Sequence, residues 1–156
     1  MSGKLEVSFN SPQCGWMSIG FDDGVSEFHT TTAYTPYPLA LNDILKGLTS
    51  LLDLARPKDK FLILWSRNPE MYDFCFERTG EIVRFKIIEY PTVGRAENEA
   101  ETVFSHEGNV HAFCRAFYKT FVQLYEEKST DEFEFNWRQP FPFREYEEFR
   151  SKITTK

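Results

Sequence analysis

The sequence lacks the features by which membrane, secreted and disulfide-bonded proteins are recognised. No apolar run approaches the roughly 18 residues of a membrane-spanning helix, and residues 1–6 lead without an apolar stretch into a predicted strand. The three cysteines, Cys14, Cys75 and Cys114, are odd in number and widely spaced, which is typical of reduced thiols. We therefore expect a soluble, cytoplasmic protein with no membrane segment and no secretory signal.

Motifs for phosphate binding, nucleophilic catalysis and metal binding are also missing. There is no GxGxxG, P-loop or GxSxG sequence and no CxxC or HxxxH spacing. The segment around Cys14, QCGW, has some likeness to the nucleophile segment of cysteine proteases, but it lies in a predicted turn. His29, His106 and His111 show no metal-ligand spacing. We therefore expect no metal, no cofactor and no catalytic residue.

Positive charge is scarcer than negative charge. The chain has 18 Lys and Arg residues against 24 Asp and Glu residues, a net charge of −6. Binding to nucleic-acid phosphates needs the opposite sign, so we expect no nucleic-acid partner. Between residues 126 and 148, eight acidic residues stand against three basic ones. This concentration of negative charge favours a basic protein partner.

Aromatic residues, in contrast, are abundant, at 17% of the chain with 16 phenylalanines. This apolar content excludes disorder, and the length is sufficient for one domain with a large core, which we expect to span residues 1–156. Alternation with period two predicts strands at 4–10, 16–22, 25–33, 71–77, 82–90 and 102–106. Helical spacing predicts long helices at 41–55 and 109–125 and a short one at 142–153.

These elements predict an α+β fold. We expect a single domain with a mainly antiparallel sheet of about six to seven strands, two long helices packed on one face, and a short C-terminal helix. Residues 61–65 are apolar at every position and are expected to form either a central strand covered on both faces or a strand covered by a helix. Asp23-Gly24 predicts a two-residue hairpin loop, and Thr79-Gly80 predicts another that sets Phe74 opposite Phe85.

Acidic residues interleave with aromatic residues in the last third of the chain, at 131–137 and 145–149. Aromatic side chains supply contact area for a partner, while carboxylates steer a basic one. The alternative is that the aromatic residues face inward and pack this segment on the core, leaving the carboxylates outside. The residues predicted to bind the partner are Glu132, Glu134, Trp137, Glu145 and Glu148.

The order of elements carries a resemblance to a known group of proteins. A strand hairpin, a Tyr37-Pro38-Leu39 connector into a helix, a three-strand meander and a second helix are followed by Trp137, Phe141-Pro142 and a last helix. This layout resembles small uncharacterised bacterial proteins, some of which are similar to immunity proteins of polymorphic toxin systems. The resemblance implies a non-catalytic, cytoplasmic protein that binds and blocks a toxin domain, and it identifies no catalytic residues.

Two other functions remain open from the sequence. A pocket near Cys14, His29 or His111 would indicate a small-molecule-binding or enzymatic domain, and a solid core at that place would count against it. A purely structural subunit of an assembly would present a large apolar interface instead. We expect a protein without enzymatic activity.

Overall fold

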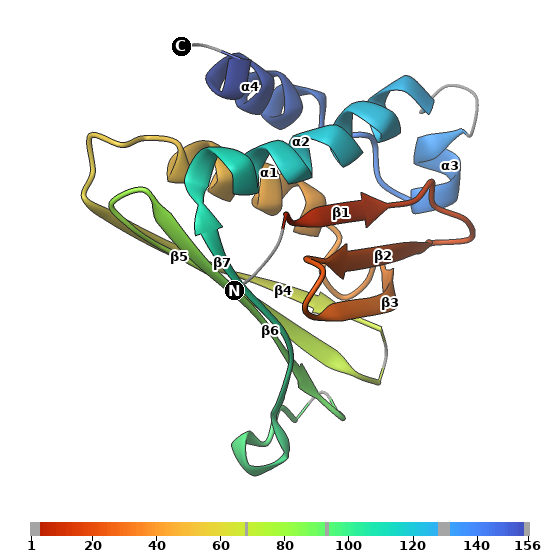
Figure 1. The fold of residues 1–156 in the computed structure, drawn as a ribbon. Coiled ribbons are helices and arrows are strands. Elements are labelled where there is room, and N and C mark those ends of the chain that lie inside the picture. The colour runs from red at the N-terminus through yellow and green to blue at the C-terminus, as the bar shows by residue number, and fades with distance from the viewer. Residues whose placement is uncertain (1–3, 68, 93, 128–131, 155–156) are drawn as a thin grey trace.

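The computed structural model describes residues 4–67, 69–92, 94–127 and 132–154. In these residues the chain is an α+β fold with two antiparallel sheets: sheet A in the order β1-β2-β3 and sheet B in the order β4-β5-β6-β7 (Figure 1). The prediction of one sheet of six to seven strands is therefore wrong in this respect. The elements are β1 (Glu6–Phe9), β2 (Trp16–Asp22), β3 (Glu27–Ala33), α1 (Ala40–Leu51), β4 (Lys58–Ser66), β5 (Met71–Thr79), β6 (Ile82–Tyr90), η1 (Glu97–Glu99), β7 (Glu101–Asn109), α2 (Val110–Glu127), α3 (Phe133–Trp137) and α4 (Phe143–Thr154).

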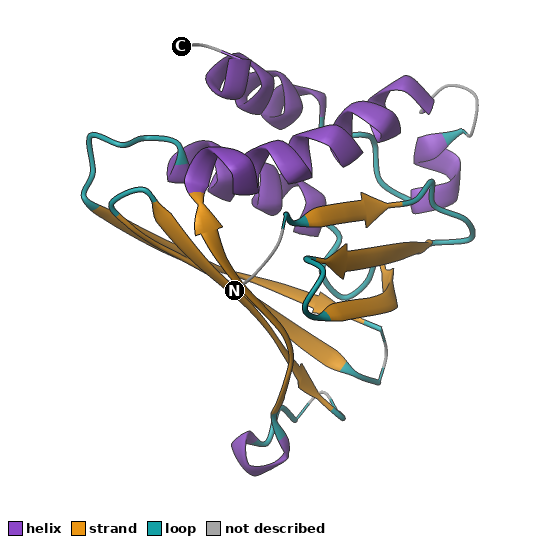
Figure 2. Cartoon of the chain, viewed as in Figure 1, coloured by secondary structure: helices purple, strands orange, loops and turns teal. Residues whose placement is uncertain are grey.

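Sheet A and helices α1 and α2 lie on the same face of sheet B, and α4 packs on α1 and α2 from the other side (Figure 2). The apolar stripe of each helix faces this interior, as in α2, where Phe113, Phe117 and Phe121 are buried. Asn109 begins α2, because its side-chain oxygen accepts hydrogen bonds from the backbone amides of His111 and Ala112, at 2.9 and 3.3 Å.

Phe21 of β2 is the point at which the two sheets meet. Its ring centroid lies 5.8 Å from that of Phe74, 5.4 Å from Phe85 and 5.7 Å from Phe104, all of sheet B. The ring of Phe117 on α2 lies 6.1 Å away. Edge-on and tilted ring pairs of this kind add to the hydrophobic gain from burial. Sheet A, sheet B and α2 therefore share one aromatic core.

The sheets remain separate because side chains, and not a backbone ladder, join β3 to sheet B. The indole Nε1–H of Trp65 in β4 donates to the carbonyl oxygen of Ala33 at the end of β3, at 3.2 Å. The hydroxyls of Thr30 and Tyr72 are 2.8 Å apart and form a second link. The chain leaves β3 through a connector into α1 before it returns as β4, so these two strands never pair.

In both predicted hairpins, the observed strand register differs from the predicted one by two residues. In the β5–β6 hairpin, Thr79 pairs with Ile82, so the loop is Gly80-Glu81 and Phe74 lies opposite Ile87 and not Phe85. Gly80 has φ of +59°, which suits a glycine in such a turn. A slip of two residues leaves every side chain on its predicted face, which is why the alternation could not distinguish the two registers.

The β2–β3 hairpin has a four-residue loop, since Asp22 pairs with Glu27. The predicted two-residue loop at Asp23-Gly24 is therefore wrong. The Asp23 carboxylate faces inward and accepts hydrogen bonds from the backbone amides of Val25 and Ser26, at 3.0 and 2.9 Å. These bonds close the loop and hold the carboxylate in a fixed position.

One further expectation about a strand is corrected. β4 is an edge strand of sheet B with α1 on one face, and Leu62 on its outer face is 50% exposed, so the alternative of a central strand covered on both faces is wrong. The segment 133–138, in which aromatic and polar residues alternate, forms the short helix α3 over Phe133–Trp137. Phe133 and Trp137 stand four residues apart and are buried on one face of this helix, which uses the same aromatic residues with helical spacing.

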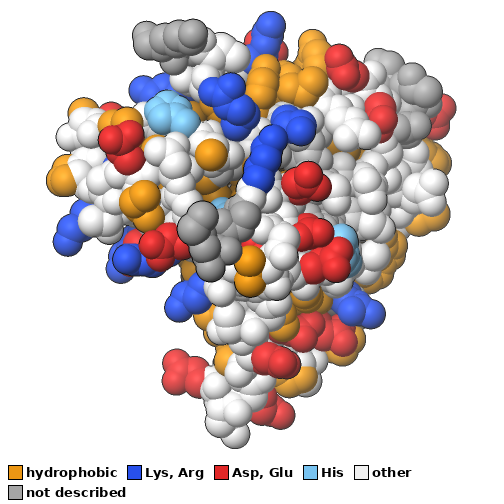
Figure 3. All heavy atoms as spheres, in the orientation of Figure 1, with side chains coloured by type: hydrophobic (Ala, Val, Ile, Leu, Met, Phe, Trp, Pro, Cys, Tyr) orange, Lys and Arg blue, Asp and Glu red, His pale blue; other side chains and the backbone are white. Residues whose placement is uncertain are grey.

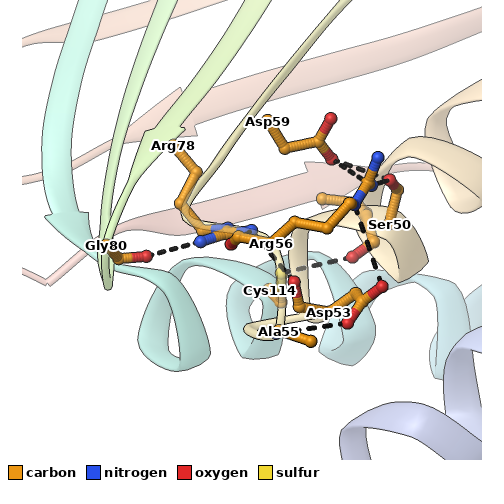
Figure 4. Close-up of polar contacts among 9 residues, drawn as sticks. Ser50, Asp53, Ala55, Arg56, Asp59, Arg78, Gly80 and Cys114 are labelled. Carbon is orange, nitrogen blue, oxygen red and sulfur yellow. Dashed lines mark hydrogen bonds and ion pairs between the residues drawn. The ribbon is translucent and has the colours of Figure 1, made fainter.

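Arg78 is a buried arginine that joins two segments through three backbone carbonyl groups (Figure 4). Its Nη1 donates to the carbonyl oxygen of Gly80 at 2.6 Å, and its Nη2 donates to those of Asp53 and Arg56 at 3.1 and 2.9 Å. Asp53 and Arg56 lie in the segment that follows α1, and Gly80 lies in the β5–β6 turn. The buried guanidinium therefore ties the end of the first helix to the central hairpin.

Replacing Arg78 by Met should destabilise the protein, because it removes the three guanidinium hydrogen bonds; the Asp53 carbonyl oxygen keeps a second donor, the Arg56 amide. We expect the free energy of unfolding in urea to fall by about 2–4 kcal/mol. The control is Arg84→Met, which removes an exposed ion pair with Glu107 and is expected to cost at most about 1 kcal/mol. Equal losses in the two variants would contradict the role given to Arg78.

Candidate functional site

The residues predicted to bind a partner divide into two groups in the structure. Glu132 and Glu134 are exposed at α3, together with Phe135, whose side chain is 67% exposed. Trp137, on the opposite face of α3, is only 1% exposed and packs edge-on against Trp65 with ring centroids 6.3 Å apart. The indole is therefore part of the core, and the sequence reasoning was wrong to place it on a contact surface.

Glu145 and Glu148 lie on α4 and already have polar neighbours. The Glu145 carboxylate accepts a hydrogen bond from the side-chain amide of Asn42 at 3.3 Å, and Glu148 forms an exposed ion pair with Arg144, also at 3.3 Å. In the described part of the chain, neither Glu132 nor Glu134 forms an ion pair. We call Glu132, Glu134 and Phe135 the α3 surface. It contains the two predicted carboxylates that have no ion pair within the described residues, and Phe135, which the prediction did not include.

α3 is held in place from several sides. The backbone amide of Gly15, in the turn before β2, donates to the carbonyl oxygen of Asn136 at 2.6 Å. The Arg138 guanidinium donates to the carbonyl oxygen of Phe135 at 2.8 Å and lies over the Phe135 ring, 5.5 Å from its centroid. On the inner side, Phe133 packs edge-on against Phe141. The exposed phenylalanine is therefore carried on an anchored segment.

A cleft of about 760 Å³ opens at a different place, between β1, the end of β7 and the first half of α2. All three histidines line it: His29 from β3, His106 from β7 and His111 from α2. Cys14 does not line this cleft and is exposed in the turn before β2. The structure thus brings together the two histidines named by the pocket hypothesis and separates the cysteine from them.

A buried acid–base pair forms one side of this cleft. His106 and Asp23 are 8% and 1% exposed, and the ring nitrogen Nδ1 lies 2.9 Å from the carboxylate oxygen Oδ2. Burial by itself would raise the pKa of Asp23, but hydrogen bonds from the Ser26 amide, the His106 ring and the Val25 amide outweigh it and lower the pKa to about 2. Asp23 is therefore ionised at neutral pH, and as an acceptor it holds the proton of His106 on Nδ1.

The Asp23–His106 pair could not be predicted from the sequence, for a physical reason. Asp23 and His106 are 83 residues apart, and Asp23 has the position and the following glycine of an ordinary turn residue. No local spacing signals a contact that only the packing of sheet A on sheet B creates. His106 was considered as a candidate ligand, but its partner was not.

No group of three or more His, Cys, Asp or Glu side chains in the described ranges of the chain is arranged to hold a metal ion. Of the helices in the same ranges, none is long and apolar enough to cross a membrane.

The lowered pKa of Asp23 predicts how stability depends on pH. A carboxyl group with a pKa of about 2 in the folded state and an ordinary value near 4 when unfolded stabilises the protein by about 2 kcal/mol above pH 4. This contribution is lost as the pH falls from about 4 to 2. The Asp23→Asn variant should have a lower free energy of unfolding in urea than the wild type at pH 7. Its free energy of unfolding should also change less than that of the wild type as the pH falls from about 4 to 2. Glu27→Gln, at an exposed ion pair with His29, is the control, and an Asp23→Asn curve that follows it would contradict the assignment.

Comparisons with known proteins give no further identification. No family model matches the chain, and no curated protein and no solved structure is significantly similar to it. The interpretation of both surfaces therefore rests on their own geometry and charge.

Proposed function

We propose that this protein is a non-catalytic binding module that holds a basic protein partner against the α3 surface. The observation that carries the proposal is Phe135, a large aromatic side chain that is 67% exposed on an anchored helix, shortly after the exposed Glu132 and Glu134. An exposed aromatic residue of this kind is typical of an interface anchor, because its burial on binding contributes more to the binding free energy than the burial of most other residues does.

The anchoring of α3 supports a binding role. An exposed side chain on a mobile loop loses conformational freedom when a partner binds, and this loss reduces affinity. Here the backbone of Phe135 and Asn136 is fixed by hydrogen bonds from Arg138 and Gly15, and the ring itself contacts the Arg138 guanidinium. Little freedom therefore remains to be lost on binding.

The charge around Phe135 specifies the kind of partner. Glu132 and Glu134 precede it without ion pairs in the described residues and outnumber the one base that contacts the ring, Arg138; the whole chain has a net charge of −6. Unpaired carboxylates attract a basic surface and raise the rate of association. The resemblance of the element order to immunity proteins suggests a specific case, in which the partner is a toxin domain that is blocked while bound.

Phe135→Ala should weaken binding by roughly 30-fold or more, which corresponds to about 2 kcal/mol for an interface anchor. Candidate partners are captured from a lysate of the native host on the immobilised protein, and the products of the adjacent genes are expressed as further candidates. Each candidate is purified, and its affinity is then measured by calorimetry. Because Phe135 is exposed, unfolding in urea should be unchanged. Wild-type affinity in this variant, or no partner by either route, would contradict the proposal.

Reversing charge at Glu132 and Glu134 tests the electrostatic part separately. The double variant Glu132→Lys, Glu134→Lys should lower the association rate by about tenfold at low salt and reduce its dependence on ionic strength. The matched control is Glu97→Lys, Glu99→Lys in η1, at the opposite end of the molecule (Figure 1). A loss of rate that is equal in both variants would show a general charge effect and would argue against this site.

A further inference from the structure

The cleft beside the Asp23–His106 pair has a basic wall. His111, Arg115 and Lys119 recur at every fourth residue of α2 and line the cleft as one stripe, and Lys4 lines it from the chain before β1. In the described residues, none of these four forms an ion pair with an acid. Figure 3 shows Lys and Arg side chains gathered over α2 and acidic side chains over sheet A. The acids of the lining, Glu6, Asp22 and Glu107, lie on β1, β2 and β7, and Glu107 is paired with Arg84. The bases are therefore gathered on the α2 side of the cleft, and that wall favours the anionic group of a ligand.

The inner part of the cleft is apolar and kept open by a glycine. Val7, Phe21, Ala112 and Phe113 are among the residues that line it. A Cβ atom on Gly108 would lie 3.1 Å from Nε2 of His106, so a side chain there would crowd this nitrogen. The absence of a side chain at position 108 leaves space in front of the ring, and the apolar lining suits the body of a small organic molecule.

Backbone groups of β1 are also directed into the cleft. The Asn10 amide donates to the carbonyl oxygen of Ser18 on β2. Ser8 and Glu6, two and four residues before Asn10, likewise direct their backbone groups toward β2. In an antiparallel ladder, the residues between them turn their N–H and C=O groups to the other side. The Phe9 amide on that side donates to the hydroxyl of Thr120 at 2.7 Å, and the groups of Val7 face the cleft.

His106 offers a hydrogen-bonding group at the inner end. Since Asp23 accepts the proton on Nδ1, Nε2 of the neutral ring carries a lone pair, and this nitrogen becomes a donor when the ring is protonated. No described residue forms a hydrogen bond with Nε2. The ring is also fixed, because it stacks on Phe113 with centroids 6.4 Å apart. A ligand in the cleft thus meets a positioned imidazole nitrogen at one end and the basic wall at the other.

We propose that this cleft binds a small organic anion, a phosphate ester or carboxylate with an apolar body. Its anionic group lies against Lys4, Arg115 and Lys119, and its body lies over the apolar lining toward His106. The cleft lies apart from the α3 surface, so this proposal does not depend on the proposed protein partner. The volume of about 760 Å³ is within the range of small-molecule sites.

The test uses phenyl phosphate, benzoate and the neutral benzyl alcohol as probes for the full chain. Binding is measured by calorimetry and by the NMR signal of the His106 ring. At least one anion should bind with a dissociation constant of about 1 mM or tighter and shift the His106 signal, and benzyl alcohol should bind at least tenfold more weakly. Comparison of phenyl phosphate with benzoate shows whether the anion is a phosphate or a carboxylate.

Two variants and one control locate the ligand. Arg115→Gln, Lys119→Gln should weaken anion binding at least tenfold, while Lys58→Gln, Lys60→Gln on β4, at the opposite edge of sheet B, should leave it unchanged. Gly108→Ala should reduce the shift of the His106 signal by placing a methyl group beside Nε2. The proposal is overturned if neither anion binds at about 20 mM, if benzyl alcohol binds equally well, or if the basic-wall variant binds like the wild type.

Discussion

The packing of Phe21 against the phenylalanines of sheet B is the contact on which the rest of this structure depends. It makes the inner faces of two sheets into one core, and α2 closes that core through Phe117. Because the sheets are joined face to face and not edge to edge, β1 and β7 remain unpaired edges. The cleft lies between them, and the Asp23–His106 pair crosses from one sheet to the other at its inner side.

The sequence predicts the faces of the strands better than their partners. In β5, Phe74 and Phe76 point inward as their alternation predicts, because the side on which a residue lies depends only on the local period. Their cross-strand partners on β6 lie two residues from the predicted ones. A shift of two residues leaves every side chain on the same face, so the alternation is equally compatible with both registers. The division into two sheets depends on how β3 meets β4, two strands separated by a helix, and local patterns carry no information about that contact.

The candidate sites show the same limit in different forms. Over the five residues of α3, burial of Phe133 and Trp137 fits a strand with period two as well as one turn of helix, so the sequence could not exclude Trp137 from the surface. The acidic character of Glu132 and Glu134 was visible in the sequence, but the exposure of Phe135, the residue after Glu134, was not. The Asp23–His106 contact joins residues that look unrelated in sequence and is created only by tertiary packing.

Two surfaces with opposite charge thus lie on one scaffold, the acidic α3 surface and the basic wall of the cleft. The central claim is that the first of these receives a protein. Hydrogen–deuterium exchange of the protein, free and in complex with the purified partner, tests this claim most directly. We predict added protection of the backbone amides of 132–138, with little change in β4, β5 and β6. Protection confined to the outer strands of sheet B, or none at α3, would contradict the account.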